Sequence, residues 1–172
     1  QTLKKVVQLA SNKGIKIAFN PSSYQCEEGK GVLMSVLKHL EVLVLNKEEA
    51  ELLVGKGNMK ELTKKLHLYG PKIICVTNGG KGASCWYKDV LYSIAPKKKR
   101  KVVETTGAGD AFASAFVAGL AYKKPIEFCL RLAVLNAESV VAHHGAKNDL
   151  LTKRKVWALV AKDKRPIRKE KA

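Results

Sequence analysis

The amino-acid sequence predicts an α/β fold in which helices cover both faces of a mostly parallel β-sheet. Short apolar runs of strand length alternate with segments of helical periodicity, and polar or glycine-containing turns follow several of the runs. The hydrophobic fraction of 46% is that of a globular chain. In such sheets ligands bind at the carboxyl ends of the strands, so we expect the functional residues directly after strands.

The first half of the chain alternates helices and strands. Helical spacing of the apolar residues predicts helices over 2–13, 31–39, 47–54 and 59–69. Short apolar runs predict strands over 15–19, 42–45 and 72–76, and residues 20–23 are expected to form a turn. These alternations are typical of βαβ units, which build a parallel sheet.

The second half begins with a predicted hairpin and continues with helices. Strands are expected over 82–87 and 90–95, with Lys88-Asp89 as the tight turn between them. A basic strand is expected to lead into the glycine-rich segment near residue 107. Helices are then predicted over 108–122, 126–142 and 152–162.

Length and composition restrict the class of protein. At 172 residues the chain can bury a core, and no apolar run approaches the roughly 20 residues of a membrane span. The opening residues show no secretory signal pattern. The four cysteines form no Cys-x-x-Cys pair and indicate buried free thiols in a reducing compartment: Cys26, Cys75, Cys85 and Cys129. We therefore predict a cytoplasmic protein with no membrane partner.

The net charge of +17 is concentrated in two segments. Residues 97–101 are all basic, and residues 153–171 hold nine basic and two acidic side chains. Such a balance suits nucleic acid, an acidic membrane surface or phosphorylated substrates. The interpretation that we favour is a solvated surface with a frayed basic tail over 163–172.

Residues 105–110, Thr-Thr-Gly-Ala-Gly-Asp, are the most informative motif. They follow a strand-like run and open an apolar helix. Gly107 and Gly109 remove side chains at the helix N-terminus, so bare backbone N–H groups can face an anion. The carboxylate of Asp110 beside that anion suggests a general base that takes a proton from an alcohol during phosphoryl transfer.

Two further polar turns each follow a predicted strand. Taken alone, Asn46 and Glu49 would form a helix capping box, because they occupy the N-cap and third helical positions. Taken alone, residues 77–82, Thr-Asn-Gly-Gly-Lys-Gly, would form a glycine-rich turn between two strands. Both motifs therefore admit a structural and a functional interpretation.

The three motifs, taken in their order along the chain (46–49, 77–82 and 105–110), resemble the PfkB, or ribokinase-like, carbohydrate kinases. That family transfers the γ-phosphoryl group of ATP to a sugar or nucleoside hydroxyl. The resemblance covers about residues 2–160 and corresponds to the C-terminal half of the family. It implies a three-layer ribokinase-like (Rossmann-like) sheet over 1–162, without the family's N-terminal half and β-lid, followed by the basic tail 163–172.

The resemblance also implies roles for the matched residues. Asp110 would be the catalytic base, and the amides of Gly107, Ala108, Gly109 and Asp110 would form an anion hole. The nucleotide would be contacted by Asn46, Thr77, Gly79, Gly82, Thr106, Asn136 and Gly145. Mg²⁺ would be bound through Glu49. A K⁺ site would involve Glu104, where the family usually has Asp, and the loop of Gly145-Ala146.

The chain lacks a counterpart of the family's sugar-binding half. We therefore hypothesise a fragment, or one half of a split kinase that needs a partner chain and is inactive without it. The predicted function is an ATP- and Mg²⁺-dependent phosphotransferase acting on a sugar, sugar phosphate or nucleoside. The alternative is a non-catalytic nucleotide-binding half-domain or a basic RNA-associated module.

Overall fold

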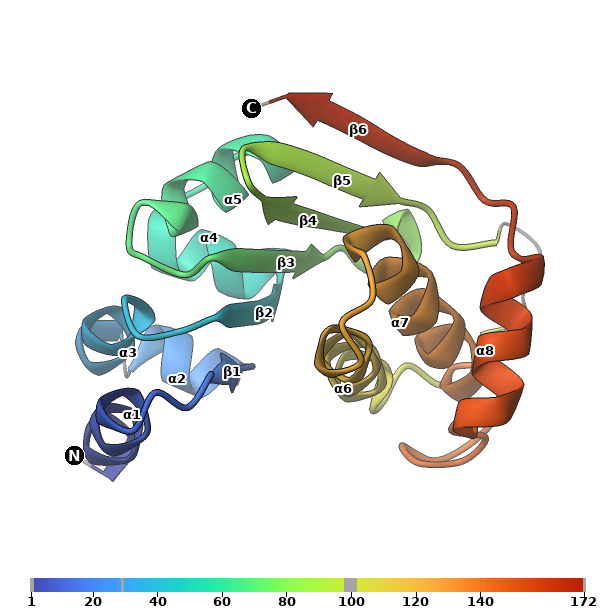
Figure 1. Cartoon of the computed structure of the whole chain (residues 1–172), viewed down its shortest axis with the longest axis horizontal. Coiled ribbons are helices and arrows are strands. Elements are labelled where there is room, and N and C mark those ends of the chain that lie inside the picture. The colour runs from blue at the N-terminus through green and yellow to red at the C-terminus, as the bar shows by residue number, and fades with distance from the viewer. Residues whose placement is uncertain (1, 29, 98–101, 172) are drawn as a thin grey trace. The chain divides into compact units, whose positions relative to one another are not determined.

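The structure is a computed structural model and describes residues 2–28, 30–97 and 102–171 (Figure 1). Its helices are α1 (Thr2–Asn12), α2 (Ser23–Glu27), α3 (Lys30–Leu37), α4 (Lys47–Val54), α5 (Met59–His67), α6 (Ala108–Ala121), α7 (Ile126–Val140) and α8 (Lys153–Lys162). Its strands are β1 (Ala18–Phe19), β2 (Val42–Asn46), β3 (Ile73–Thr77), β4 (Ala83–Tyr87), β5 (Val90–Ile94) and β6 (Ile167–Lys171).

The described strands form one mixed sheet in the order β1-β2-β3-β4-β5-β6. Strands β1, β2 and β3 are parallel, and β4 and β5 form the predicted hairpin (Figure 1). Its turn residues Lys88 and Asp89 both have positive φ, 50° and 57°, as a two-residue hairpin turn that follows the strand twist requires. The predicted α/β class and the hairpin are thus confirmed.

The chain divides into two compact units. The first comprises Gln1–Asn78, Ser84–Leu91 and Glu170–Ala172, and the second comprises Gly79–Ala83 and Tyr92–Lys169. In the first unit, the apolar side chains of β2 and β3 are buried along nearly their whole length, as expected of parallel strands covered on both faces. Leu43, Leu45, Ile74 and Val76 share one core cluster with side chains of α3 and α5.

The second unit is built on the helices α6, α7 and α8. Gly119 of α6 allows a close approach to α7, because a Cβ there would lie 2.8 Å from the sulfur of Cys129. Leu132 and Leu135 of α7 pack with Val156 and Val160 of α8 in a separate apolar cluster. All four cysteines of the chain are buried thiols that form no disulfide, as predicted.

The segment 163–172, expected to be a frayed tail, instead contains the strand β6 over residues 167–171, which lies beside β5 in the sheet. Arg165 fastens the segment that precedes β6, because its guanidinium bonds Glu138 at 2.7 Å and Asp163 at 2.5 Å. Four of the five β6 residues are exposed, so the strand lacks the apolar alternation by which strands are recognised.

Three smaller expectations differ from the structure. The turn predicted over 20–23 ends in the short helix α2, which Ser22 caps with Gln25 in a capping box. The strand predicted over 15–19 is shortened to 18–19. Of the basic strand expected before the glycine motif, residues 98–101 lie outside the described residues, and 102–104 are not in a strand.

Among the residues described, no helix is long and apolar enough to cross a membrane.

Candidate functional site

The carboxyl ends of the parallel strands carry the polar residues that the sequence singled out in the first unit. Asn46 ends β2 and Thr77 ends β3, and the two are register partners in the sheet. Asn20 follows β1 and donates its side-chain N–H to the carbonyl oxygen of Val44 at 2.8 Å. The sheet therefore brings Asn46 and Thr77, the first residues of the two polar motifs predicted in this unit, to one edge.

Asn46 and Glu49 form the predicted capping box. Asn46 Oδ1 accepts the N–H of Glu49 at 2.8 Å, and Glu49 Oε2 accepts the N–H of Asn46 at 2.9 Å. The second carboxylate oxygen, Oε1, accepts the hydroxyl of Ser23 at 3.1 Å. Ser23 was not predicted from the sequence, since one serine in a polar turn carries no distinguishing pattern.

The surroundings of Glu49 restrict how it could hold Mg²⁺. The residue is only 7% exposed, and both carboxylate oxygens already accept a hydrogen bond. The described residues contain no group of three or more His, Cys, Asp or Glu side chains that could bind a metal ion. A single carboxylate that acts through bound water, with phosphate oxygens completing the shell, is the donor set that Mg²⁺ accepts.

In the glycine-rich turn after β3, one position has no room for a side chain. Gly82 has φ +102°, and a Cβ there would lie 2.1 Å from the carbonyl oxygen of Ile94. By contrast, a Cβ at Gly79 would meet no atom within 4 Å, although φ is +46°. Of the glycines expected at the nucleotide, Gly82 therefore serves the close contact with the end of β5, and Gly79 faces open space.

In the second unit, the start of α6 has the geometry expected of an anion site. Gly107 is the N-cap in a left-handed conformation, φ +80°, and provides no side-chain cap. The first helical hydrogen bond runs from Ala111 N–H to Gly107 O at 2.9 Å. Among the hydrogen bonds of the described residues, none uses the N–H groups of Gly109 and Asp110, so both are available to a ligand.

Asp110 stands in the first turn of α6 and is exposed. A Cβ at Gly109 would meet no atom within 4 Å, so the space beside this turn is open. An exposed carboxylate and two unpaired N–H groups in one helical turn can face a phosphoryl group and the hydroxyl that attacks it.

Asn136 of α7 is 7% exposed and bonds two other segments of the second unit. Its Nδ2 donates to the carbonyl of Ala111 at 2.9 Å, and its Oδ1 accepts the N–H of Leu151 at 3.0 Å. Ala111 directly follows Asp110. In this structure the side chain, predicted at the nucleotide, holds the first turn of α6 in place.

Glu104 and Gly145, both predicted near a cation, lie together. Glu104 Oε2 accepts the N–H of Gly145 at 2.9 Å. That bond, a hydrogen bond from the Thr106 side chain and the nearby His144 hold the pKa of Glu104 below its usual 4.5, although desolvation opposes the shift. The same loop contacts α6, because a Cβ on Gly107 would lie 2.4 Å from Ala146 O.

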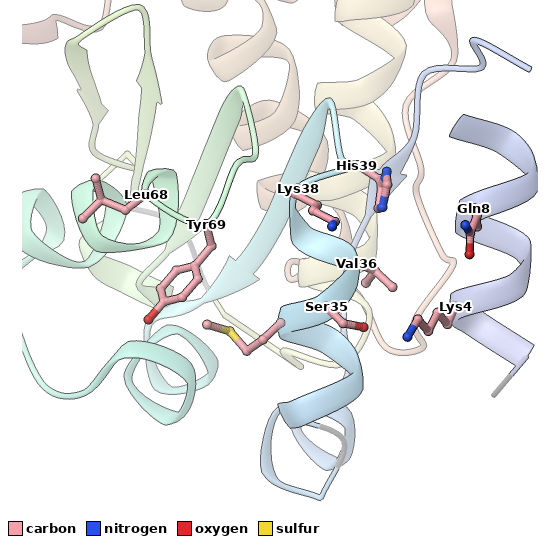
Figure 2. A pocket seen from close by; sticks show the side chains of 9 residues that line it. Lys4, Gln8, Ser35, Val36, Lys38, His39, Leu68 and Tyr69 are labelled. Atoms are coloured by element: carbon pink, nitrogen blue, oxygen red, sulfur yellow. The ribbon is translucent and has the colours of Figure 1, made fainter. Parts of the chain in front are cut away.

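A separate hollow of about 570 Å³ lies in the first unit (Figure 2). It is lined by Lys4 and Gln8 of α1, residues at the end of α3, and Leu68 and Tyr69 after α5. The segments after α3 and α5 lead into β2 and β3, so this hollow lies at the amino ends of those strands. It is therefore not part of the strand-end site at Asn46 and Thr77.

The sequence matches a known protein family and several known proteins. Residues 1–153 match the model of the pfkB family carbohydrate kinases. A cytidine kinase of Thermococcus kodakarensis is 30% identical over 144 residues, which cover 82% of this chain and 51% of the relative. A 5-dehydro-2-deoxygluconokinase of Halalkalibacterium halodurans is 28% identical over 95% of this chain and 52% of the relative.

A solved structure shows the same fold. A candidate ribokinase II of E. coli, in complex with ATP and Mg²⁺, superposes with a TM-score of 0.82 at 21% identity and covers 94% of this chain and 53% of its own. The chain thus spans about half the length of the proteins that it matches. The ribokinase-like fold predicted from the three motifs is confirmed.

Proposed function

Because the chain belongs to the pfkB family of carbohydrate kinases, we propose that it transfers the γ-phosphoryl group of ATP to the hydroxyl of a small alcohol. The start of α6 is the observation that carries this proposal. There an exposed carboxylate stands in the same turn as two unpaired N–H groups, with open space beside Gly109. Phosphoryl transfer needs an oriented acceptor hydroxyl and donors for the charge on the transferred group.

In this proposal Asp110 is the general base, and the amides of Gly107, Ala108, Gly109 and Asp110 form the anion hole. The N–H of Ala108 donates to Thr105 O at 3.2 Å, the long end of the usual range, so this hydrogen bond is weak and a ligand could replace it. Asp110 orients the acceptor hydroxyl and accepts its proton as the bond to phosphorus forms. A helix N-terminus attracts the negative charge of the transferred group without further reorganisation.

The strand-end residues of the first unit are proposed to hold the nucleotide phosphates. Asn46 and Thr77 supply polar side chains at the carboxyl ends of neighbouring strands, where ligands of such sheets bind. Glu49 would hold Mg²⁺ through bound water, since its carboxylate is already engaged by the capping box. When bound, Mg²⁺ would neutralise charge on the phosphates.

The acceptor is proposed to be a sugar, a sugar acid or a nucleoside. This rests on the relatives, which include a cytidine kinase and several 5-dehydro-2-deoxygluconokinases. A K⁺ site at Glu104 and Gly145 stays a prediction. There the Gly145 N–H donates to one carboxylate oxygen of Glu104, Oε2. The cytoplasmic location also stays a prediction.

Activity is proposed to require a second half, in the same polypeptide or in a partner chain, because the matched proteins are about twice as long. Strand β1 is the end strand of the described sheet, and Val6, Leu9 and Ile15 of the first unit are more than half exposed. Exposed apolar side chains beside a strand edge promote association.

In sedimentation velocity, we expect the chain alone to self-associate as its concentration rises. Val6→Gln with Leu9→Gln should reduce this association, whereas Lys5→Gln with Lys13→Gln should not. A monodisperse monomer that is fully active in the kinase assay would contradict the need for a second half.

The role of Asp110 is tested by Asp110→Asn in the chain and in any longer polypeptide that contains it. We expect kcat to fall by about 100-fold or more while ATP affinity and thermal stability stay near wild type. Asp89→Asn is the matched control, because Asp89 is also exposed and its positive φ suits asparagine. A fall in kcat below threefold for Asp110→Asn would contradict the assignment.

The second candidate is a nucleotide-binding half-domain without turnover, which the half-length match favours. The two candidates separate in one experiment. If ATP with Mg²⁺ raises the melting temperature but neither cytidine nor 5-dehydro-2-deoxygluconate is phosphorylated, the half-domain holds. Phosphorylation of either acceptor, lost in Asp110→Asn, supports the kinase.

A further inference from the structure

A cluster of aromatic rings and basic side chains lies in the second unit, apart from the α6 turn that carries Asp110. Trp157 of α8 makes edge-to-face contacts with Tyr122, at 5.5 Å between ring centroids, and with Phe128 of α7, at 5.3 Å. Such contacts hold the three rings in fixed orientations. Tyr122 is 51% exposed, so one ring of the cluster presents much of its surface to solvent.

Two lysine ammonium groups lie against these rings. Lys153 Nζ is 4.1 Å from the centroid of Tyr122 and 5.4 Å from that of Trp157. Lys124 Nζ is 4.8 Å from the centroid of Trp157 and 5.7 Å from that of Phe128. Cation–π attraction restrains both ammonium groups without neutralising them, so their charge remains available to an anion.

The two segments that supply the lysines of the cluster contain no acidic residue. Neither residues 117–126 nor residues 150–162 contain an Asp or Glu, whereas they include Lys123, Arg154 and Lys155 besides the two restrained lysines. The adjacent carboxylates are engaged elsewhere, Glu127 with Lys169, Asp149 with His143 and Asp163 with Arg165. Three cations in the first turn of α8 also oppose the helix dipole, so they do not serve the helix itself.

We propose that this surface, formed by Tyr122, Lys124, Lys153, Arg154, Lys155 and Trp157, binds single-stranded nucleic acid. The basic side chains contact the phosphates, and the exposed ring of Tyr122 stacks on a base. Basic grooves with interspersed aromatic rings are the usual means by which proteins bind single strands without reading sequence. This activity is independent of the proposed phosphotransfer.

An anionic membrane is the competing partner, and the exposed face of α8 argues against it. The exposed residues of α8 are Lys153, Arg154, Lys155, Ala158, Ala161 and Lys162, none of which has a large apolar side chain. The apolar side chains Val156 and Val160 are buried against α7. A helix that lies in a membrane surface needs its apolar face free to enter the lipid.

The test measures fluorescence anisotropy of a labelled 20-nucleotide single-stranded RNA with the full chain. We expect saturable binding at 50 mM KCl that weakens about 50-fold at 200 mM, the dependence for roughly four phosphate contacts on a single strand. Quenching of Trp157 fluorescence should accompany binding, because the other tryptophan, Trp86, is buried.

Paired variants locate the binding surface. Lys124→Gln with Lys153→Gln should weaken binding at least tenfold and lower the salt dependence, whereas the equally charged change Lys5→Gln with Lys13→Gln in the first unit should alter it less than twofold. Tyr122→Ala should weaken binding at least fivefold, and Tyr122→Phe, which keeps the ring, should restore it. Asp110→Asn should bind the RNA as wild type does.

Three outcomes would overturn the proposal. They are no RNA binding at 50 mM KCl, an equal loss in the Lys5/Lys13 control, and binding to phosphatidylserine vesicles, but not to RNA, that depends on Lys124 and Lys153. The last result would assign the surface to a membrane. Since none of these measurements uses the kinase reaction, a failure here leaves the proposed phosphotransfer untouched.

Discussion

The two glycines at the start of α6, Gly107 and Gly109, differ in whether the backbone geometry requires a glycine. Gly107 is required by shape, since its φ is +80° and a Cβ would lie 2.4 Å from Ala146 O. Gly109 has neither constraint, because its φ is ordinary and a Cβ would meet no atom within 4 Å. The sequence pattern alone treats both glycines alike as bare backbone for an anion.

This difference predicts opposite effects of two alanine substitutions. Gly107→Ala should destabilise the fold by about 1–3 kcal/mol, because it forces a left-handed residue against the 145–146 loop. Gly109→Ala should leave thermal stability unchanged or raise it, since alanine favours the helix. If the bare turn binds phosphate, Gly109→Ala should still weaken ATP binding. Thermal melts and calorimetric ATP titration measure the two effects. Equal stability of both variants would contradict the geometric distinction.

Asn136 is a residue whose hydrogen-bond partners the sequence could not predict. Its position on a helix was predictable, and its two hydrogen-bond partners, Ala111 O and Leu151 N–H, were not. Those partners lie 25 and 15 residues away in the chain. Only the packing of α7 against the start of α6 and against the segment before α8 brings them within hydrogen-bond distance of one amide.

At the scale of elements, α4 and α5 begin in the same way. Each has an Asn N-cap and a Glu at the third helical position, Asn46 with Glu49 and Asn58 with Glu61, and both form complete capping boxes. Only the first follows a strand of the sheet directly, since Asn46 is the last residue of β2. The capping box is therefore no evidence of function, and the strand end in front of it is what distinguishes α4.

The pair offers a matched test of the Asn46 assignment. Asn46→Ala and Asn58→Ala should each lower the free energy of unfolding by about 1 kcal/mol, the usual cost of losing an N-cap. Only Asn46→Ala should also reduce ATP affinity, because only that residue is proposed to face phosphates. Chemical denaturation and ATP titration separate the two effects. An equal loss of ATP affinity in both variants would reduce Asn46 to a helix cap.

At the scale of the whole molecule, ion pairs and hydrogen bonds hold several carboxylates ionised. A hydrogen bond from Gly145 lowers the pKa of Glu104, and one from Lys169 lowers that of Glu127. Burial raises the pKa of Asp163, but hydrogen bonds and charge from Arg165 lower it by more than burial raises it, so the net shift is downward. All three groups belong to the second unit.

These shifts predict loss of stability in acid. A carboxylate with a depressed pKa stabilises the fold fully above its ordinary value, 4.5 for Glu and 3.8 for Asp. That contribution is lost as the pH falls through the lower folded pKa. The melting temperature should therefore be flat from about pH 6 to 8 and fall below about pH 4.5. Glu104→Gln with Glu127→Gln should show a smaller fall. An unchanged pH profile in that double variant would contradict these contacts.

Apolar periodicity, glycines and capping residues act through neighbouring positions in the chain, so the fold class, the hairpin and the polar motifs after β2 and β3 were predictable from the sequence. Three features could be recognised only in three dimensions: the last basic segment enters the sheet as β6, space requires the glycines at 82 and 107, and Tyr122, Lys124, Lys153 and Trp157 form one surface. Those features depend on contacts between residues far apart in the chain, such as Arg165 with Glu138, and a local sequence pattern cannot predict such contacts.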